Sequence, residues 1–217
     1  MILIFGMRAR VKAVANGEFF CTNCGADRSY VLQQIRRWFT FFFVPLFPTG
    51  RPFAEQVACT TCHTVFPTDV LDTPTSAVFS ETLRGAIRVA ATSMLVAGDP
   101  ASGPARSVAI DAARRSGSDN YDDTWLANDL EAVEPSQLAE YLEPLAKGLD
   151  PQGKEIFVEQ IARVGLADGP LNPAQSRLLE SLSSALGLSA THLRGIIVTV
   201  APQSSTGDGP PDEFRHN

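Results

Sequence analysis

Apolar residues recur at helical spacing over most of the chain, from about residue 75 to residue 200. Three stripes carry the pattern, each with apolar residues three and four positions apart. Their members are Ile87, Ala90, Ala91, Met94 and Leu95; Ile156, Phe157, Ile161 and Val164; and Leu178, Leu179, Leu182 and Leu186. Because such stripes are typical of buried helix faces, residues 75–200 are predicted to form an all-α bundle of about seven short helices.

Capping residues mark the ends of these predicted helices. Thr73-Pro74, Asp150-Pro151 and Asn172-Pro173 each place a capping residue before a proline, which suits the first helical position. Gly187 is placed to end one helix, and Ser189 is placed to begin the next.

A faint repeat runs through the predicted bundle. Residues 87–117 and 157–187 each read as a helix, a loop and a second helix of similar length. The loops are Ala97-Gly-Asp-Pro100 and Ala167-Asp-Gly-Pro170, so that Asp99 corresponds to Asp168. Two helical hairpins about a pseudo-twofold axis would explain the repeat. The alternative is that aspartate and glycine simply suit turns between helices.

The first 70 residues have a different pattern, with an aromatic run at Trp38–Pro48 beside Arg36, Arg37 and Arg51. Eleven residues are too few for a membrane-spanning helix, and the two prolines would break one. Its composition favours a buried or partner-covered β-strand. The alternative is a peripheral contact with a membrane surface, because aromatic and basic side chains occur together at such interfaces.

Two Cys-x-x-Cys pairs supply the clearest chemistry, and they contain every cysteine of the chain. Cys21, Cys24, Cys59 and Cys62 have the number and spacing of ligands for a structural zinc ion. Gly25 follows the first pair and can adopt a positive φ, whereas His63 stands in that place after the second. The alternatives are c-type haem attachment at Cys59–His63 and a redox dithiol.

Length and charge set the remaining bounds. The chain has 217 residues, of which 44% are hydrophobic, and is expected to hold two units. Residues 1–70 carry seven basic and four acidic residues, whereas the rest of the chain has a net charge of −9. This weak positive balance does not favour nucleic acid as a partner. The start of the sequence does not read as a signal peptide, so a cytoplasmic protein is expected, and residues 202–217 read as a flexible tail.

The N-terminal segment, residues 1–70, resembles a bacterial zinc-ribbon family found at the N-terminus of uncharacterised proteins. The resemblance rests on four groups of residues, the last of which is the second cysteine pair. They are Ile4–Arg10, Gly17–Arg28, Arg37–Thr40 with Phe43-x-Pro45-Leu46, and Cys59-x-x-Cys62. The resemblance implies a small β ribbon that binds zinc and has no assigned activity. His63 stands where the family usually has glycine.

Residues 75–200 are similar to the TerB-like helical domain of tellurite-resistance and stress proteins. The similarity rests on Val164–Gly169, Leu171-Asn-Pro173 and Ser184–Ser189. It implies that the loop aspartates Asp99 and Asp168 are candidate ligands for a divalent cation. Pro170, Gln175 and Ser176 stand where the family often has acidic residues, which leaves such a site with few ligands.

No catalytic constellation stands out, since the three histidines are His63, His192 and His216 and no phosphate-binding loop is visible. The sequence therefore favours a non-catalytic zinc-binding interaction or adaptor protein over an enzyme. The resemblances imply a role in tellurite resistance or the general stress response, with a protein partner that the sequence does not identify. The alternatives are a divalent-metal-responsive sensor acting through the helical domain and a scaffold at a membrane surface.

Overall fold

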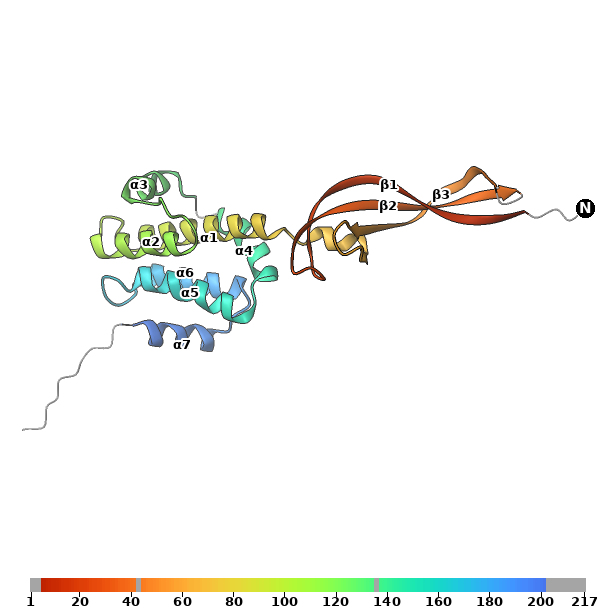
Figure 1. Cartoon of the computed structure of the whole chain (residues 1–217). Helices are drawn as coiled ribbons and strands as arrows, with labels where there is room; N and C mark the ends of the chain where they lie inside the picture. The colour runs from red at the N-terminus through yellow and green to blue at the C-terminus, as the bar shows by residue number, and fades with distance from the viewer. Residues whose placement is uncertain (1–4, 42–43, 135–136, 202–217) are drawn as a thin grey trace, which may run out of the picture. The chain divides into compact units, whose positions relative to one another are not determined.

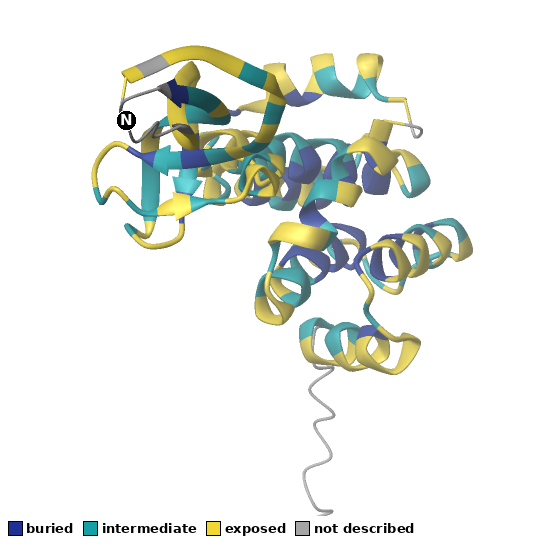
Figure 2. Ribbon diagram, turned by 90° about the vertical axis from the view of Figure 1, so that its right-hand side faces the viewer, coloured by how far each residue is buried: buried dark blue, intermediate teal, exposed yellow. Residues whose placement is uncertain are grey.

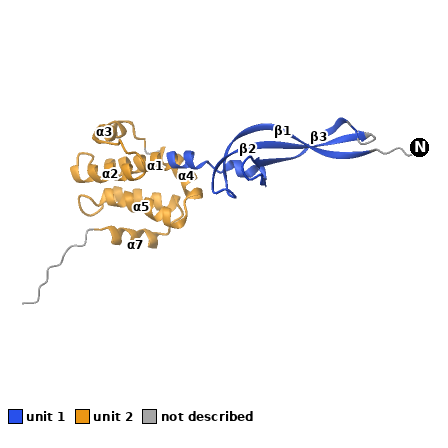
Figure 3. Ribbon diagram, viewed as in Figure 1, with its two compact units in different colours: residues 1–81 blue, residues 82–217 orange. Residues whose placement is uncertain are grey.

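The computed structural model describes residues 5–41, 44–134 and 137–201 of the chain. The chain divides into two compact units, residues 1–81 and 82–217 (Figure 3). Each unit has its own secondary structure and is described separately. No helix in the described ranges has the length and apolar character needed to cross a membrane.

The first unit is built on three long antiparallel strands, β1 (Phe5–Cys21), β2 (Ala26–Phe41) and β3 (Val44–Cys59) (Figure 1). A two-residue strand, β4 (Val65–Phe66), completes the sheet in the order β1-β2-β3-β4. A short 3₁₀ helix, η1 (Thr68–Asp72), follows. Strands of 16 and 17 residues span about 50 Å at roughly 3.3 Å per residue, so the predicted ribbon is much more extended than usual.

The core of this unit lies at the end of the sheet that contains the cysteines. Phe19, Val57, Cys21 and Cys59 are buried there. The Phe19 ring packs edge-on against Tyr30 and Phe66, with both pairs of ring centres 5.7 Å apart. β4 pairs with β3 at this end, and η1 contacts β1 and β3 and packs Val70 and Leu71 against the core, so that η1 covers one face of the sheet there.

The other end of the sheet has no such cover and is called the distal arm, namely residues 5–14, 34–41 and 44–54. Within its described side chains only Thr40 is buried, and its hydroxyl donates to the Gly6 carbonyl at 2.8 Å. The prediction of strand at Trp38–Pro48 is confirmed, although residues 42 and 43 lie outside the described residues. Leu46 and Phe47 of this segment are each 53% exposed, so the described part of the strand is not buried within the ribbon itself, and its cover by a partner stays a prediction.

Seven helices follow the sheet in the described part of the chain, as predicted (Figure 1). They are α1 (Ser76–Ala97), α2 (Gly103–Arg115), α3 (Asp123–Ala132), α4 (Gln137–Gly148), α5 (Pro151–Gly165), α6 (Pro173–Ala185) and α7 (Ala190–Val200).

The predicted caps at Asp150, Asn172 and Ser189 are confirmed, and each side chain accepts a backbone N–H of the first turn. The predicted start at Thr73 is wrong. Thr73 ends η1, and the Thr75 hydroxyl accepts the Val78 N–H at the start of α1 instead.

The two predicted helix–loop–helix segments correspond to α1 followed by α2 and to α5 followed by α6, and α5 packs against both α6 and α2. Both second helices have 13 residues, and Gly117 and Gly187 follow them with φ of 98° and 79°. The predicted stripes form much of the interior, which is dark blue in Figure 2. Ile156 is the exception, because its side chain is 45% exposed. It precedes Phe157 on α5 and therefore points away from the buried face.

Candidate metal centre

The four cysteines meet at the core end of the sheet because both pairs occupy tight turns where strands end. β1 ends at Cys21, whose carbonyl accepts the N–H groups of Cys24 at 3.1 Å and Gly25 at 2.9 Å. β3 ends at Cys59, whose carbonyl accepts the His63 N–H at 3.1 Å. The long β2–β3 hairpin returns the second pair to the first.

Both turns end in left-handed backbone, as the sequence indicated. Gly25 has a φ of 65° and His63 has a φ of 59°. His63 is therefore the structural counterpart of Gly25. What the two residues share is the left-handed backbone that ends each turn, and the imidazole of His63 has no counterpart at Gly25. His63 does not belong to the cluster of four sulfurs.

The geometry of the sulfurs suits a metal ion. All four Sγ atoms lie within 4.8 Å of one another, and those of Cys21 and Cys62 are 3.7 Å apart. Thiolates at about 2.3 Å from a tetrahedral ion would be separated by roughly 3.8 Å. No disulfide joins them, since the cysteines are free. The four cysteines can thus hold one metal ion, and they form the only group of three or more potential ligands within the described residues.

The surroundings of Cys24 and Cys62, the two half-buried cysteines, shift the pKa values of their thiols in opposite directions. Burial, helped by hydrogen bonds with the neighbouring thiols, raises the pKa of Cys24 to about 12. Hydrogen bonds from Thr64 and Asn23 lower the pKa of Cys62 to about 5. A divalent cation among the four sulfurs would favour the thiolate at every position, because the metal replaces the proton as the positive partner.

The convergence of all four sulfurs bears on the alternative interpretations of the cysteines. A redox dithiol needs one pair, and haem attachment needs the second pair with His63. Neither requires Cys21 and Cys24 to lie against Cys59 and Cys62. The observed cluster is therefore what a shared metal ion requires and is not explained by either alternative.

The two candidate aspartates of the helical region lie in the loops where they were expected. Asp99 lies between α1 and α2, where its carboxylate accepts the Ala101 N–H at 2.9 Å. Asp168 lies between α5 and α6, directly before Gly169. The Asn172 side chain donates to the Ala97 carbonyl at 2.8 Å and so ties the two loops together. Neither aspartate joins a group of three potential ligands in the part of the chain described.

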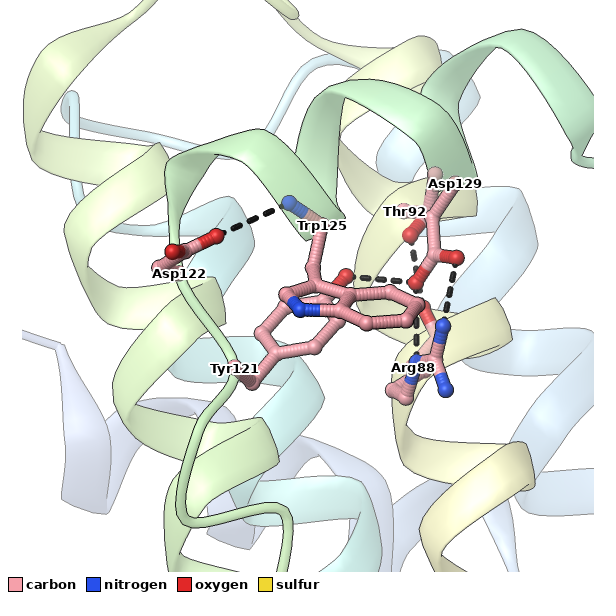
Figure 4. Close-up of polar contacts among 6 residues, drawn as sticks. All are labelled: Arg88, Thr92, Tyr121, Asp122, Trp125 and Asp129. Atoms are coloured by element: carbon pink, nitrogen blue, oxygen red, sulfur yellow. Dashed lines mark hydrogen bonds and ion pairs between the residues drawn. The ribbon is translucent and has the colours of Figure 1, made fainter.

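A polar network between α1 and α3 was missed by the sequence analysis (Figure 4). The Arg88 guanidinium donates two hydrogen bonds to the Asp129 carboxylate, at 2.9 and 2.6 Å, and Tyr121 donates a third at 2.6 Å. The guanidinium also lies 5.0 Å from the centre of the Tyr121 ring and 5.9 Å from that of Trp125. The sequence around either residue does not predict this network, because Arg88 and Asp129 are 41 positions apart along the chain.

This network joins α1 to α3, and its charged and hydroxyl groups are used in hydrogen bonds to one another. The Asp129 carboxylate raises the pKa of Arg88, and burial raises the pKa of Tyr121, so both groups keep their protons. A cavity of about 180 Å³ adjoins it. Its lining residues are Gly85, Arg88, Val89, Thr92, Asp129, Ala132, Val133, Gln137 and Tyr141. They include no histidine or cysteine.

A second polar pair joins α5 and α7. The His192 Nε2 lies 2.8 Å from the Glu155 carboxylate, beside a cavity of about 550 Å³. A catalytic histidine of the triad type also contacts a nucleophile. No serine, threonine or cysteine side chain is hydrogen-bonded to the His192 ring within the described residues.

Comparison of the chain with models of protein families, with curated proteins and with solved structures finds no match. The metal-binding capacity of the first unit therefore rests on the geometry of its cysteines.

Proposed function

We propose that the four cysteines hold one zinc ion and that the protein is a non-catalytic interaction protein whose ribbon is a docking element. The observation that carries the proposal is the cluster of four sulfurs at the base of the extended distal arm. A tetrahedral set of four thiolates selects zinc or iron among the common metals.

A four-thiolate site has a structural rather than a catalytic character. Every position of a tetrahedral ion is then taken by sulfur, so that no position is open for water or substrate. The ion would join the β1–β2 turn to the end of β3 and so fix the base of the arm. The arm beyond it leaves large apolar side chains in solvent, which is typical of a surface that binds a partner.

The biological process rests on the resemblance of the helical region to TerB-like domains. That resemblance suggests a part in tellurite resistance or the general stress response. Deleting the gene in its host and measuring growth with and without tellurite tests this part of the proposal. An unchanged tolerance would remove tellurite resistance without affecting the zinc site.

The zinc site is tested by metal analysis of the purified full-length protein. One zinc per chain is expected, whereas iron would give a coloured protein. Cys21→Ser and Cys59→Ser should each lose the metal and unfold the ribbon, because structural zinc contributes on the order of 10 kcal/mol to folding. Helical circular dichroism should be largely kept. Full zinc occupancy in both variants would contradict the proposal.

A further inference from the structure

The distal arm combines positive charge with exposed apolar surface. It carries Arg8, Arg10, Lys12, Arg36, Arg37 and Arg51 and has no acidic residue, while Glu55 directly follows it on β3 and accepts a hydrogen bond from the Gln34 amide at 2.7 Å. The chain as a whole has a net charge of −6, so this concentration is local.

The register of β1 and β2 sorts the side chains onto two faces, because residues paired across strands point to the same side. One face, here called the apolar face, carries Met7 opposite Phe39 and Val11 opposite Ile35, with Arg37 opposite Ala9 between these pairs. Phe47 of β3 extends this face, since it pairs with Phe39 and stacks on its ring at 5.3 Å.

The opposite face, here called the basic face, carries Arg8 opposite Trp38 and Arg10 opposite Arg36. Lys12 lies on the same face. Two arginines directly opposite each other destabilise a strand pair, and an anion beside them would remove that penalty. Arg36 also has a buried Nε with no hydrogen-bond partner in the described part of the chain.

The apolar surface of the arm is large for a part without cover. Six large apolar side chains are more than half exposed, and they come from both the tip and the edges of the sheet. They are Met7 at 64%, Val44 at 56%, Val11 at 55%, and Leu46, Phe47 and Phe53 each at 53%. An exposed face of this kind marks a binding surface rather than a solvated one.

Three classes of partner would suit a surface of apolar and basic side chains, namely a single-stranded nucleic acid, a second copy of the chain and an anionic lipid bilayer. The ring contacts argue against the first, and the charge of the arm argues against the second. Binding of a single-stranded nucleic acid requires free aromatic faces on which bases can stack. Here Phe39 and Phe47 stack on each other, Arg37 covers Phe53 at 5.2 Å, and Arg10 lies 5.9 Å from the centre of Trp38. A second copy of the chain would bring two sets of six cations together, which charge repulsion opposes.

We propose that the distal arm docks on the surface of an anionic lipid bilayer, as the partner for the docking element of the proposed function. With the arm end-on to the bilayer, its tip, with Met7, Phe39, Leu46 and Phe47, would enter the interface between headgroups and acyl chains, so that both faces stand in the headgroup layer. Trp38 and the arginines would lie at headgroup level, where tryptophan and basic side chains are enriched. The negative surface potential of the bilayer complements the charge of the arm.

The test uses the full-length, metal-loaded protein and vesicles of phosphatidylcholine alone or mixed with phosphatidylglycerol. The protein should co-sediment with the anionic vesicles only, and added salt should weaken the binding. The chain has two tryptophans, so a Trp125→Phe variant leaves Trp38 as the reporter. Its emission should shift to shorter wavelength when anionic vesicles are added.

Two variants of the arm should lose this binding. Arg10→Gln with Arg36→Gln should lower the partition coefficient about 25-fold, since each basic residue contributes roughly fivefold near an anionic surface. Phe47→Ser should lower it about tenfold or more through lost apolar contact. The matched controls lie on helices, namely Arg177→Gln with Arg194→Gln and the exposed Val198→Ser, and they should bind as the wild type does.

The metal content of each variant is measured as a control for folding. A variant that keeps its metal but loses vesicle binding has lost a contact with the lipid and not the fold of the ribbon. The inference is overturned if the metal-loaded wild type ignores anionic vesicles, or if the helix controls lose binding as strongly as the arm variants. Salt-sensitive binding of a single-stranded oligonucleotide in place of vesicles would assign the arm to nucleic acid. Dimerisation lost in Phe47→Ser, without vesicle binding, would assign it to self-association. In each case one bound zinc per chain would leave the zinc site of the proposed function intact.

Discussion

Gly25 and His63 occupy equivalent turns with nearly equal backbone angles but with different side chains. A left-handed backbone costs a residue with a Cβ about 1–2 kcal/mol relative to glycine. No atom lies within 4 Å of the position that a Cβ would take at Gly25, so a substitution there changes the backbone energy without a clash.

These two positions give opposite predictions. His63→Gly should raise the free energy of unfolding of the metal-loaded ribbon by about 0.5–1 kcal/mol, and Gly25→Ala should lower it by about 1 kcal/mol. Urea denaturation followed by Trp38 fluorescence, in a Trp125→Phe background, measures both. A less stable His63→Gly protein would show that the imidazole itself makes a stabilising contact.

A second contrast at the scale of the residue concerns two aspartates that pair with arginines. Asp129 binds Arg88, and their side chains are 21% and 32% exposed, whereas Asp123 binds Arg106 and is 71% exposed. Asp129→Ala should lower the free energy of unfolding by about 2–3 kcal/mol, because Arg88 and Tyr121 lose their acceptor.

Asp123→Ala is the control and should cost about 1 kcal/mol or less, since exposed ion pairs contribute little. Chemical denaturation followed by circular dichroism at a helical wavelength compares the two. Equal losses would mean that the Arg88 network adds no more than a surface pair does.

At the scale of the element, Asn172 does more than cap α6. Its side chain accepts the N–H groups of Ala174 and Gln175, Gln175 accepts the Asn172 N–H in return, and the Asn172 amide reaches the Ala97 carbonyl. Asn172→Ala should therefore cost about 2 kcal/mol of helical-unit stability, whereas Asp150→Ala, which removes only a cap, should cost about 1 kcal/mol. Thermal unfolding of both variants measures the difference, and a smaller effect at Asn172 would contradict the proposed tie between the loops.

Elements set by neighbouring residues were predicted well from the sequence. The caps at Asp150, Asn172 and Ser189 depend on side chains within three positions, and the left-handed turn at Gly25 depends on a missing Cβ. The clustering of the cysteines was also predictable, because ligand number and spacing imply a shared ion.

Two properties that distant residues set were not predictable, namely the exposure of the arm and the pairing of Arg88 with Asp129. The aromatic run at Trp38–Pro48 has the composition of a buried strand, and its exposure follows from how far β4 and η1 extend along β3. The Arg88–Asp129 pair joins residues from separate helices, and each residue alone is an ordinary charge on a helix. The exposure of the arm and the Arg88–Asp129 contact depend on the assembled fold, which the local pattern around these residues does not encode.

At the scale of the whole molecule, the ligands of the helical region predict how the protein responds to a second kind of metal. Hard cations such as calcium need six or more oxygen ligands, and Asp99 already uses one carboxylate oxygen on the Ala101 N–H. Calorimetric titration of the zinc-loaded protein with calcium, magnesium or manganese should therefore show no site tighter than about 1 mM. Asp168→Asn should behave as the wild type does. A micromolar site lost in Asp168→Asn would instead favour the divalent-metal sensor.

The long β2–β3 hairpin has a consequence for the order in which the first unit folds. Cys24 and Cys59 lie at opposite ends of this hairpin along the chain, yet their sulfurs must meet. Hairpins form within about 1–10 μs, and a slip of one residue would turn every side chain of β3 to the wrong face. Only a hairpin whose strands β2 and β3 pair in the native register brings the second pair of thiols to the first. Metal binding would thus select the native register, because only that register brings four thiolates together and gains the free energy of binding. Hairpins with a shifted register lack this stabilisation and can unfold and pair again.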